Sequence, residues 1–217
     1  YIPGEQPRQG QVIKLNTNEN PYPPSPKILE TIRESVTQDL RKYPDAGASG
    51  VRSRLSNILG APAENFVIGN GSDELLNVIL RCFAGPGDRV VFPTPTYPYY
   101  DKLIALQDAV GVPVPLDHDF NLPLDDLVQE DARVTLLANP NSPTGIGLSI
   151  DQLDELAQRV SGILVIDEAY VDFSQHQAIG VARKHKHVIV TRTLSKSFSL
   201  AGIRVGFAFA SPEIIAG

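Results

Sequence analysis

The sequence predicts an α/β fold with a mostly parallel central sheet and helices on both faces. Two observations predict it. From Asn65 onward, short apolar runs alternate with segments that have the capping residues and amphipathic pattern of helices. Some runs, such as residues 163–166 and 188–190, are apolar at every position, which is typical of strands buried on both faces of a parallel sheet.

The first part of the chain is irregular and proline-rich as far as Pro24. A helix is expected to begin after Ser25, a favoured N-cap residue, with Pro26 in its first turn, and to run to about Arg41. A second helix is expected over about 49–59, because glycine commonly follows the last residue of a helix and Gly60 stands there.

The remaining elements alternate. A capping box, Ser149 with Gln152, marks the start of one helix. Apolar composition between turn residues indicates the strands, and the spacing of apolar residues indicates the other helices. Strands are expected at 66–68, 89–92, 134–138, 163–166, 188–190 and 205–210, and further helices at 73–83 and 97–107.

Composition excludes several classes of protein. The chain has 217 residues and a formal charge of −6, so no basic face favours nucleic acid. No apolar run reaches the length of a membrane span. The single cysteine, Cys82, excludes a disulfide framework, and we expect it in the core of a cytoplasmic protein. The four histidines are not at ligand spacing, so we expect no metal site.

Candidate functional residues follow the strands, because ligands of such sheets bind beyond the carboxyl ends of the strands. A glycine turn at Gly71, Ser72 and Asp73 opens a helix and could bind an anion through backbone N–H groups, although a plain tight turn has the same pattern. Tyr97 could stack on a flat ligand, although core packing alone would also explain it.

Two further strand ends have polar side chains. The rigid loop 139–145 presents Asn141 and Ser142, either of which could hydrogen-bond a ligand. Asp167 ends an apolar strand, where a carboxylate is costly unless a cation meets it, and Tyr170 lies three residues on.

The last strand end combines a lysine with phosphate donors. Lys196 lies among hydroxyl residues, and Thr193, Ser195 and Arg204 are the donors that a phosphate dianion requires. One ligand would use all of these groups together: the anion cradle, the aromatic ring, the polar loop, the unpaired carboxylate and the amine. That ligand is pyridoxal 5′-phosphate (PLP), a protonated pyridine with an aldehyde, a phenolic oxygen and a phosphate.

The chain resembles the fold-type I PLP-dependent aminotransferases of class II, and among them the histidinol-phosphate aminotransferases. The resemblance runs through nearly the whole chain and is carried by these segments: 14–22, 42–45, 69–75, 93–97, 139–145, 167–173 and 192–207. It implies that residues 1–48 form an arm and helix of the dimer or small domain. Residues 49–217 would form the PLP-binding large domain, incomplete at its C-terminus, and the family's C-terminal small domain would be missing from this chain.

The resemblance also implies roles for residues. Lys196 would carry PLP as a Schiff base and shuttle the proton, Asp167 would pair with the ring nitrogen, and Tyr170 would donate to the phenolic oxygen. Tyr97 would stack on the ring. The phosphate would be held by Gly71, Ser72, Asp73, Thr193, Ser195 and Arg204. Tyr43 would reach the cofactor of the neighbouring subunit in a homodimer. Relatives often have Asn where Ser142 stands, so either Asn141 or Ser142 could contact the phenolic oxygen.

The implied reaction is amino-group transfer from L-histidinol phosphate to 2-oxoglutarate, which gives imidazole acetol phosphate and glutamate in histidine biosynthesis. Three alternatives stay open: a threonine-phosphate decarboxylase, an aromatic amino-acid aminotransferase, and a catalytically silent PLP-fold protein. A nucleotide-binding protein is disfavoured, because the glycine turn lacks both the P-loop lysine and a full dinucleotide fingerprint.

Overall fold

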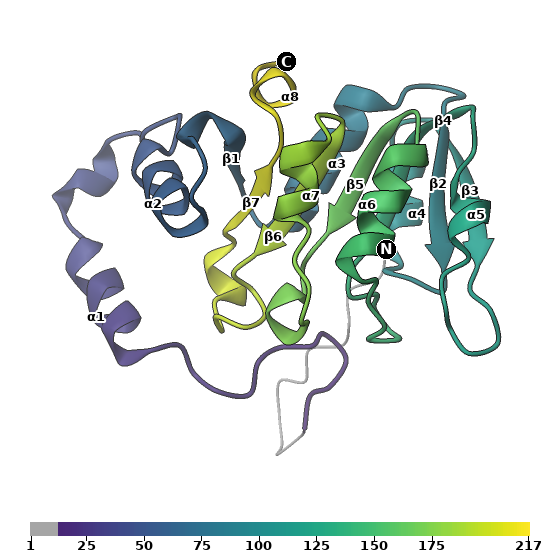
Figure 1. Ribbon diagram of the computed structural model, residues 1–217. Helices are drawn as coiled ribbons and strands as arrows, with labels where there is room; N and C mark the ends of the chain where they lie inside the picture. Colours follow the sequence, from purple (N-terminus) through teal and green to yellow (C-terminus); the bar gives the residue numbers. More distant parts are fainter. Residues whose placement is uncertain (1–12) are drawn as a thin grey trace.

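A single seven-stranded sheet forms the centre of the computed structural model, which describes residues 13–217 (Figure 1). The order along the sheet is β1-β7-β6-β5-β4-β2-β3. All neighbours are parallel except that β7 runs antiparallel to both β1 and β6. The strands are β1 (Phe66–Gly69), β2 (Arg89–Thr94), β3 (Val110–Pro115), β4 (Ala132–Ala138), β5 (Ile163–Asp167), β6 (Val188–Thr193) and β7 (Gly206–Phe209). The predicted α/β fold is confirmed.

Helices cover both faces of this sheet. In Figure 1, α6 and α7 lie in front of the strands and α3 and α4 behind them. The α-helices are α1 (Pro26–Ser35), α2 (Ser49–Leu59), α3 (Ser72–Phe83), α4 (Tyr99–Ala105), α5 (Leu124–Leu127), α6 (Ile150–Arg159), α7 (Ile179–Lys184) and α8 (Pro212–Ala216). Short 3₁₀ turns are η1 (Gln38–Arg41), η2 (Ala63–Asn65), η3 (Val171–Phe173) and η4 (Ala201–Ile203). None of the helices within residues 13–217 has the length and apolar character needed to cross a bilayer.

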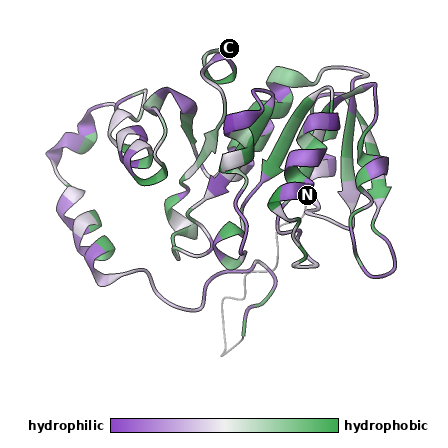
Figure 2. Cartoon of the chain, in the orientation of Figure 1, coloured by the Kyte–Doolittle hydropathy of each residue, from purple (hydrophilic) through white to green (hydrophobic). Residues whose placement is uncertain are grey.

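Two apolar layers, one on each face, explain why the central strands are apolar at every position. Successive residues of a strand point to opposite faces. Leu164 and Ile166 of β5 pack with α6 and α7, whereas Val165 between them packs with α3 and α4. Figure 2 shows the same arrangement, with hydrophobic strands enclosed by helices whose outer surfaces are hydrophilic.

The first helix is shorter than predicted. It ends at Ser35, and the separate 3₁₀ turn η1 follows, capped by the Thr37 side chain, which accepts from the Asp39 amide. No residue of α1 is buried, so no packing favours its extension through the β-branched Val36 and Thr37. The Ser25 side chain makes no capping bond, contrary to the prediction, whereas Gly60 and the Ser149 capping box behave as predicted.

Three elements were missed, and one burial prediction was wrong. Strand β3 contains Pro113 and Pro115, which the sequence pattern disfavours but an edge strand tolerates. Helices α5 and α7 are too short to show a helical period. Cys82 is exposed rather than in the core, because the buried face of α3 follows Leu76 and Leu80.

Candidate active site

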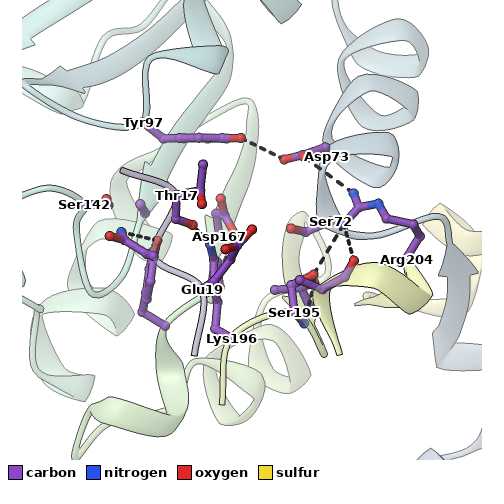
Figure 3. Close-up of a pocket in the computed structure, with 16 residues that line it drawn as sticks. Thr17, Glu19, Ser72, Asp73, Tyr97, Ser142, Asp167, Ser195, Lys196 and Arg204 are labelled. Carbon is purple, nitrogen blue, oxygen red and sulfur yellow. Dashed lines mark hydrogen bonds and ion pairs between the residues drawn. The ribbon is translucent and has the colours of Figure 1, made fainter. Parts of the chain in front are cut away.

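A pocket of about 200 Å³ opens at the carboxyl ends of the central parallel strands (Figure 3). The strand ends reach it through Ala138 of β4, Asp167 of β5 and Thr193 of β6. Ten of the thirteen predicted site residues line the pocket: Ser72, Asp73, Tyr97, Ser142, Asp167, Tyr170, Thr193, Ser195, Lys196 and Arg204. The strand-end rule therefore located the pocket correctly.

Asp167 is the buried charge of the pocket, with 4% of its surface exposed. Its Oδ1 accepts from the Ala169 amide and the Thr191 hydroxyl, both at 3.2 Å, and its Oδ2 accepts from the Tyr100 hydroxyl at 2.9 Å. Burial raises the pKa of Asp167 to about 6, although these hydrogen bonds oppose the rise. No ion pair to Asp167 occurs within residues 13–217, so a cation in the pocket would stabilise its ionised form.

Lys196 lies on the same pocket wall, in the segment after β6. Its ammonium donates to the Thr17 carbonyl at 3.0 Å and lies 5.4 Å from the centre of the Tyr170 ring. The Asn20 amide donates to the carbonyls of Lys196 and Ser197, each at 3.3 Å, and so ties the N-terminal arm to this segment. The lysine is partly buried, and its amine faces the pocket.

The structure distinguishes the two candidate loop residues. The Asn141 amide accepts from Thr96 at 2.7 Å and donates to the Pro95 carbonyl at 3.0 Å and to Thr144 at 3.1 Å. These bonds stay within the two loops, and Ser142 rather than Asn141 lines the main pocket. Asn141 therefore shapes the loop.

Tyr97 extends its ring across one side of the pocket (Figure 3). Its hydroxyl donates to Oδ1 of Asp73 at 3.2 Å, and Oδ2 of the same carboxylate lies 3.7 Å from the Arg204 guanidinium. The Asp73 side chain thus connects the Tyr97 ring to Arg204 at the cationic end of the site. Its backbone lies in the first turn of α3, where the anion cradle was predicted.

The predicted anion cradle lies at the opposite end of the pocket from the loop 139–145. Gly71, with φ of 84°, precedes α3, whose first-turn amides have no acceptor inside the helix. Thr193 and Ser195 share a hydrogen bond of 2.9 Å between their hydroxyls, and Arg204 approaches the Ser195 hydroxyl at 3.5 Å. Amides, hydroxyls and a guanidinium therefore converge, as binding of a phosphate dianion requires.

Close approach of two backbones builds this cradle. A Cβ on Gly206 of β7 would lie 2.6 Å from the Gly71 carbonyl carbon and from the Ser72 nitrogen. A Cβ on Gly71 would lie 2.6 Å from the Arg204 guanidinium, in a conformation that only glycine adopts easily. Both glycines therefore let the chain segments of the cradle meet.

We expect Gly206→Ala to lower the free energy of unfolding by about 1–3 kcal/mol and to weaken phosphate binding, because β7 and the Gly71 turn must separate. Urea unfolding and calorimetric titration with inorganic phosphate measure the two effects. Gly202→Ala is the matched control, since nothing lies within 4 Å of its Cβ position and the residue is exposed. Equal stability of the two variants would contradict the close-approach argument.

The prediction omitted the N-terminal arm from the pocket. Thr17, Asn18 and Glu19 line it, and the Asn18 amide donates to the Tyr170 hydroxyl at 2.8 Å. The density of short polar residues over 16–20 is the sequence signal that could have indicated them. Tyr43 lies outside the pocket and is fully exposed.

No group of three or more His, Cys, Asp or Glu side chains that could hold a metal ion occurs in the described part of the chain. The polar groups of the pocket are instead an amine, hydroxyls, a guanidinium, the buried carboxylate of Asp167 and the less buried carboxylates of Asp73 and Glu19. This donor set suits an organic anion with a cationic ring.

Comparison with known proteins agrees with this description. The model of the family "Aminotransferase class I and II" matches residues 10–217. The chain is 46% identical to histidinol-phosphate aminotransferase 1 of Nostoc sp. and to histidinol-phosphate aminotransferase of Geotalea uraniireducens, over 100% of this chain and 62% of each relative. The solved histidinol-phosphate aminotransferase of Sinorhizobium meliloti, in complex with pyridoxal-5′-phosphate, superposes with a TM-score of 0.87 at 31% identity. That match covers 92% of this chain and 56% of the solved one.

Proposed function

Because the chain belongs to the class I and II aminotransferase family, we propose that it is the cofactor-binding part of a PLP-dependent histidinol-phosphate aminotransferase. The chain spans about 62% of the length of the curated relatives that it matches. The activity, substrates and partners of the whole protein are therefore part of this proposal.

The pocket fits PLP. Bound PLP supplies an aldehyde carbon that links covalently to amines and a protonated ring that accepts an electron pair from the carbon beside the amine. Lys196 would hold the aldehyde carbon, and Asp167 would keep the ring nitrogen protonated. The α3 amides, Thr193, Ser195 and Arg204 would hold the phosphate. The observation that carries the proposal is that a buried carboxylate and an amine share one pocket with a phosphate-type cradle.

The residues of the chain would then move the protons. Lys196 would act as the base that takes the proton from the substrate Cα and returns it to C4′ of the cofactor. The Tyr170 hydroxyl, which accepts from Asn18, would donate to the phenolic oxygen. The Tyr97 ring, positioned by Asp73, would cover one face of the ring and exclude water.

Similarity to the histidinol-phosphate aminotransferases supports L-histidinol phosphate as amino donor and 2-oxoglutarate as acceptor. A cytoplasmic homodimer belongs to the same proposal. Its support is that α1 buries none of its residues and that Tyr43 is fully exposed, as expected of an arm that completes a partner's site. In this division, residues 1–48 form the arm and 49–217 the large domain.

Absorption spectroscopy of the whole protein with PLP tests the proposal. We expect a visible band of the lysine-linked cofactor, which borohydride reduction fixes on Lys196, and loss of this band when histidinol phosphate is added. Appearance of glutamate after addition of 2-oxoglutarate distinguishes amino transfer from decarboxylation. A PLP-loaded protein whose band does not respond to histidinol phosphate would overturn the proposed substrate, and absence of the band would overturn the proposed cofactor.

A further inference from the structure

Tyr100 is the largest fully buried side chain of the molecule as described, and it lies directly behind the pocket. Its hydroxyl donates to Oδ2 of Asp167 at 2.9 Å. Core packing alone would be satisfied by phenylalanine, because burying a hydroxyl is favourable only when it finds a partner. The hydroxyl therefore points to a role connected with the carboxylate.

The three donors to Asp167 are divided unequally between its two oxygens. The Ala169 amide and the Thr191 hydroxyl both bond Oδ1, whereas Tyr100 is the donor that the structure places on Oδ2. Bonds on both oxygens fix the rotation of the carboxyl plane about the Cβ–Cγ bond. Without Tyr100, Oδ2 would keep no described protein donor, and the carboxylate could turn.

A single turn of chain connects this hydroxyl to the aromatic wall of the pocket. The Tyr100 amide donates to the Tyr97 carbonyl at 3.1 Å, and the two rings meet edge to face, with centroids 5.6 Å apart and planes at 86°. Of these two tyrosines, three residues apart, Tyr97 presents its ring to the pocket and Tyr100 presents its hydroxyl to the buried carboxylate of Asp167.

The Tyr100 hydroxyl is suited to be a permanent donor. Burial, and then the charge of Asp167, hold the pKa of Tyr100 well above its ordinary value, and Tyr97 and Asp73 add to the rise. The phenol therefore stays protonated over the pH range in which Asp167 gains its charge. In the opposite direction, the bond from Tyr100 lowers the pKa of Asp167 against the effect of burial.

We propose that Tyr100 is a positioning residue, which fixes Oδ2 of Asp167 so that the ionised carboxylate faces the ring nitrogen of the cofactor. The inference rests on the proposed function for the identity of the ring, but the Tyr100–Asp167 pair itself can be tested without any cofactor. The role is distinct from that of Tyr97, whose ring faces the pocket directly.

The test uses Tyr100→Phe in the whole protein, which removes the hydroxyl and keeps the ring. In cofactor-free protein with ¹³C-labelled aspartate carboxyls, we expect the titration midpoint of Asp167 to rise by about one pH unit, because a hydrogen bond to the charged form is lost. In PLP-loaded protein, the visible band reports the proton on the nitrogen that links the cofactor to Lys196. A ring nitrogen that holds its own proton less firmly withdraws less electron density from this linking nitrogen, so the pH midpoint of the band should rise. Circular dichroism verifies that the fold persists. Tyr99→Phe is the matched control, because Tyr99 is the adjacent tyrosine and is not among the three donors to Asp167.

Both midpoints rising in Tyr100→Phe, but not in Tyr99→Phe, supports the proposal. An unchanged Asp167 midpoint overturns it. A raised Asp167 midpoint with an unchanged cofactor band, in protein that borohydride still labels, also overturns it, because Tyr100 would then affect the acid but not the ring. If neither variant nor parent takes up PLP, the proposed function fails, and the cofactor-free titration alone decides whether Tyr100 controls the charge of Asp167.

Discussion

Replacement of Lys196 by alanine should abolish covalent attachment of PLP and lower amino transfer by about 10³- to 10⁴-fold. Two functions are lost together: the amine that links to the aldehyde carbon, and the base that moves the proton between the substrate Cα and C4′. The groups of the phosphate cradle are untouched, so we expect PLP to bind reversibly and to be removed by dialysis.

Mass spectrometry after borohydride reduction, together with single-turnover kinetics, measures this result. Lys102→Ala is the matched control, since Lys102 is an exposed lysine of α4 outside the pocket. It should retain the adduct and the rate of the parent. A borohydride-stable adduct that persists in Lys196→Ala would contradict the assignment, because another amine would then hold the cofactor.

Asp167→Asn should have opposite effects on activity and on stability. The substitution keeps the shape of the side chain but removes the negative charge that would hold the ring nitrogen protonated. We expect the rate of amino transfer to fall by about 10²- to 10³-fold, as for loss of one preorganised electrostatic group. Steady-state and single-turnover rates at saturating PLP measure this loss.

The effect on stability follows from the pKa of Asp167, which burial raises from 3.8 to about 6. In the cofactor-free protein, the folded state binds the Asp167 proton more tightly than the unfolded state does. The resulting contribution to the free energy of unfolding is therefore fully present below about pH 4 and is lost as the pH rises through about 6. The loss amounts to about 3 kcal/mol, and asparagine does not incur it. Asp167→Asn should therefore unfold at higher urea concentration than the parent at pH 8, and the difference should shrink toward pH 4.

Asp101→Asn, an exposed carboxylate of α4, controls for removal of a charge as such and should change neither rate nor stability appreciably. If the stability of the parent does not fall between pH 4 and pH 7 relative to that of Asp167→Asn, burial does not raise the pKa of Asp167 in the folded protein. Burial would then give no reason to expect that a bound cation stabilises the ionised carboxylate.

Much of the site could be predicted because its members follow strand ends. Asp167 ends β5, whereas Thr193 ends the parallel strand β6 and Lys196 follows it by three residues. A parallel sheet brings such strand ends to one edge although they are far apart along the chain. The identity of each residue then indicated its chemistry. No comparable rule places the arm residues Thr17 and Asn18, because their position depends on hydrogen bonds such as that from Lys196 to the Thr17 carbonyl.

Hydrogen-bond partners could not be predicted from residue type. Asn141 and Ser142 are adjacent and equally polar, and only the positions of Pro95 and Thr96 on a separate loop show that Asn141 is already bonded there. The role of the Tyr100 hydroxyl likewise depends on its hydrogen bond to Asp167, 67 residues away. In each case the deciding partner is remote in sequence, so local patterns contain no record of it.

By itself the sequence determined the layered α/β architecture, the edge of the sheet that carries the pocket, and the amine, carboxylate and cradle that define its chemistry. It could do so because hydrophobic periodicity and capping act over a few residues. The tertiary structure alone decided the antiparallel direction of β7, the close approach of Gly206 to the Gly71 turn, the arm over Lys196 and the bond from Tyr100 to Asp167. These features arise from contacts between distant segments, and their energies exist only after the chain has folded.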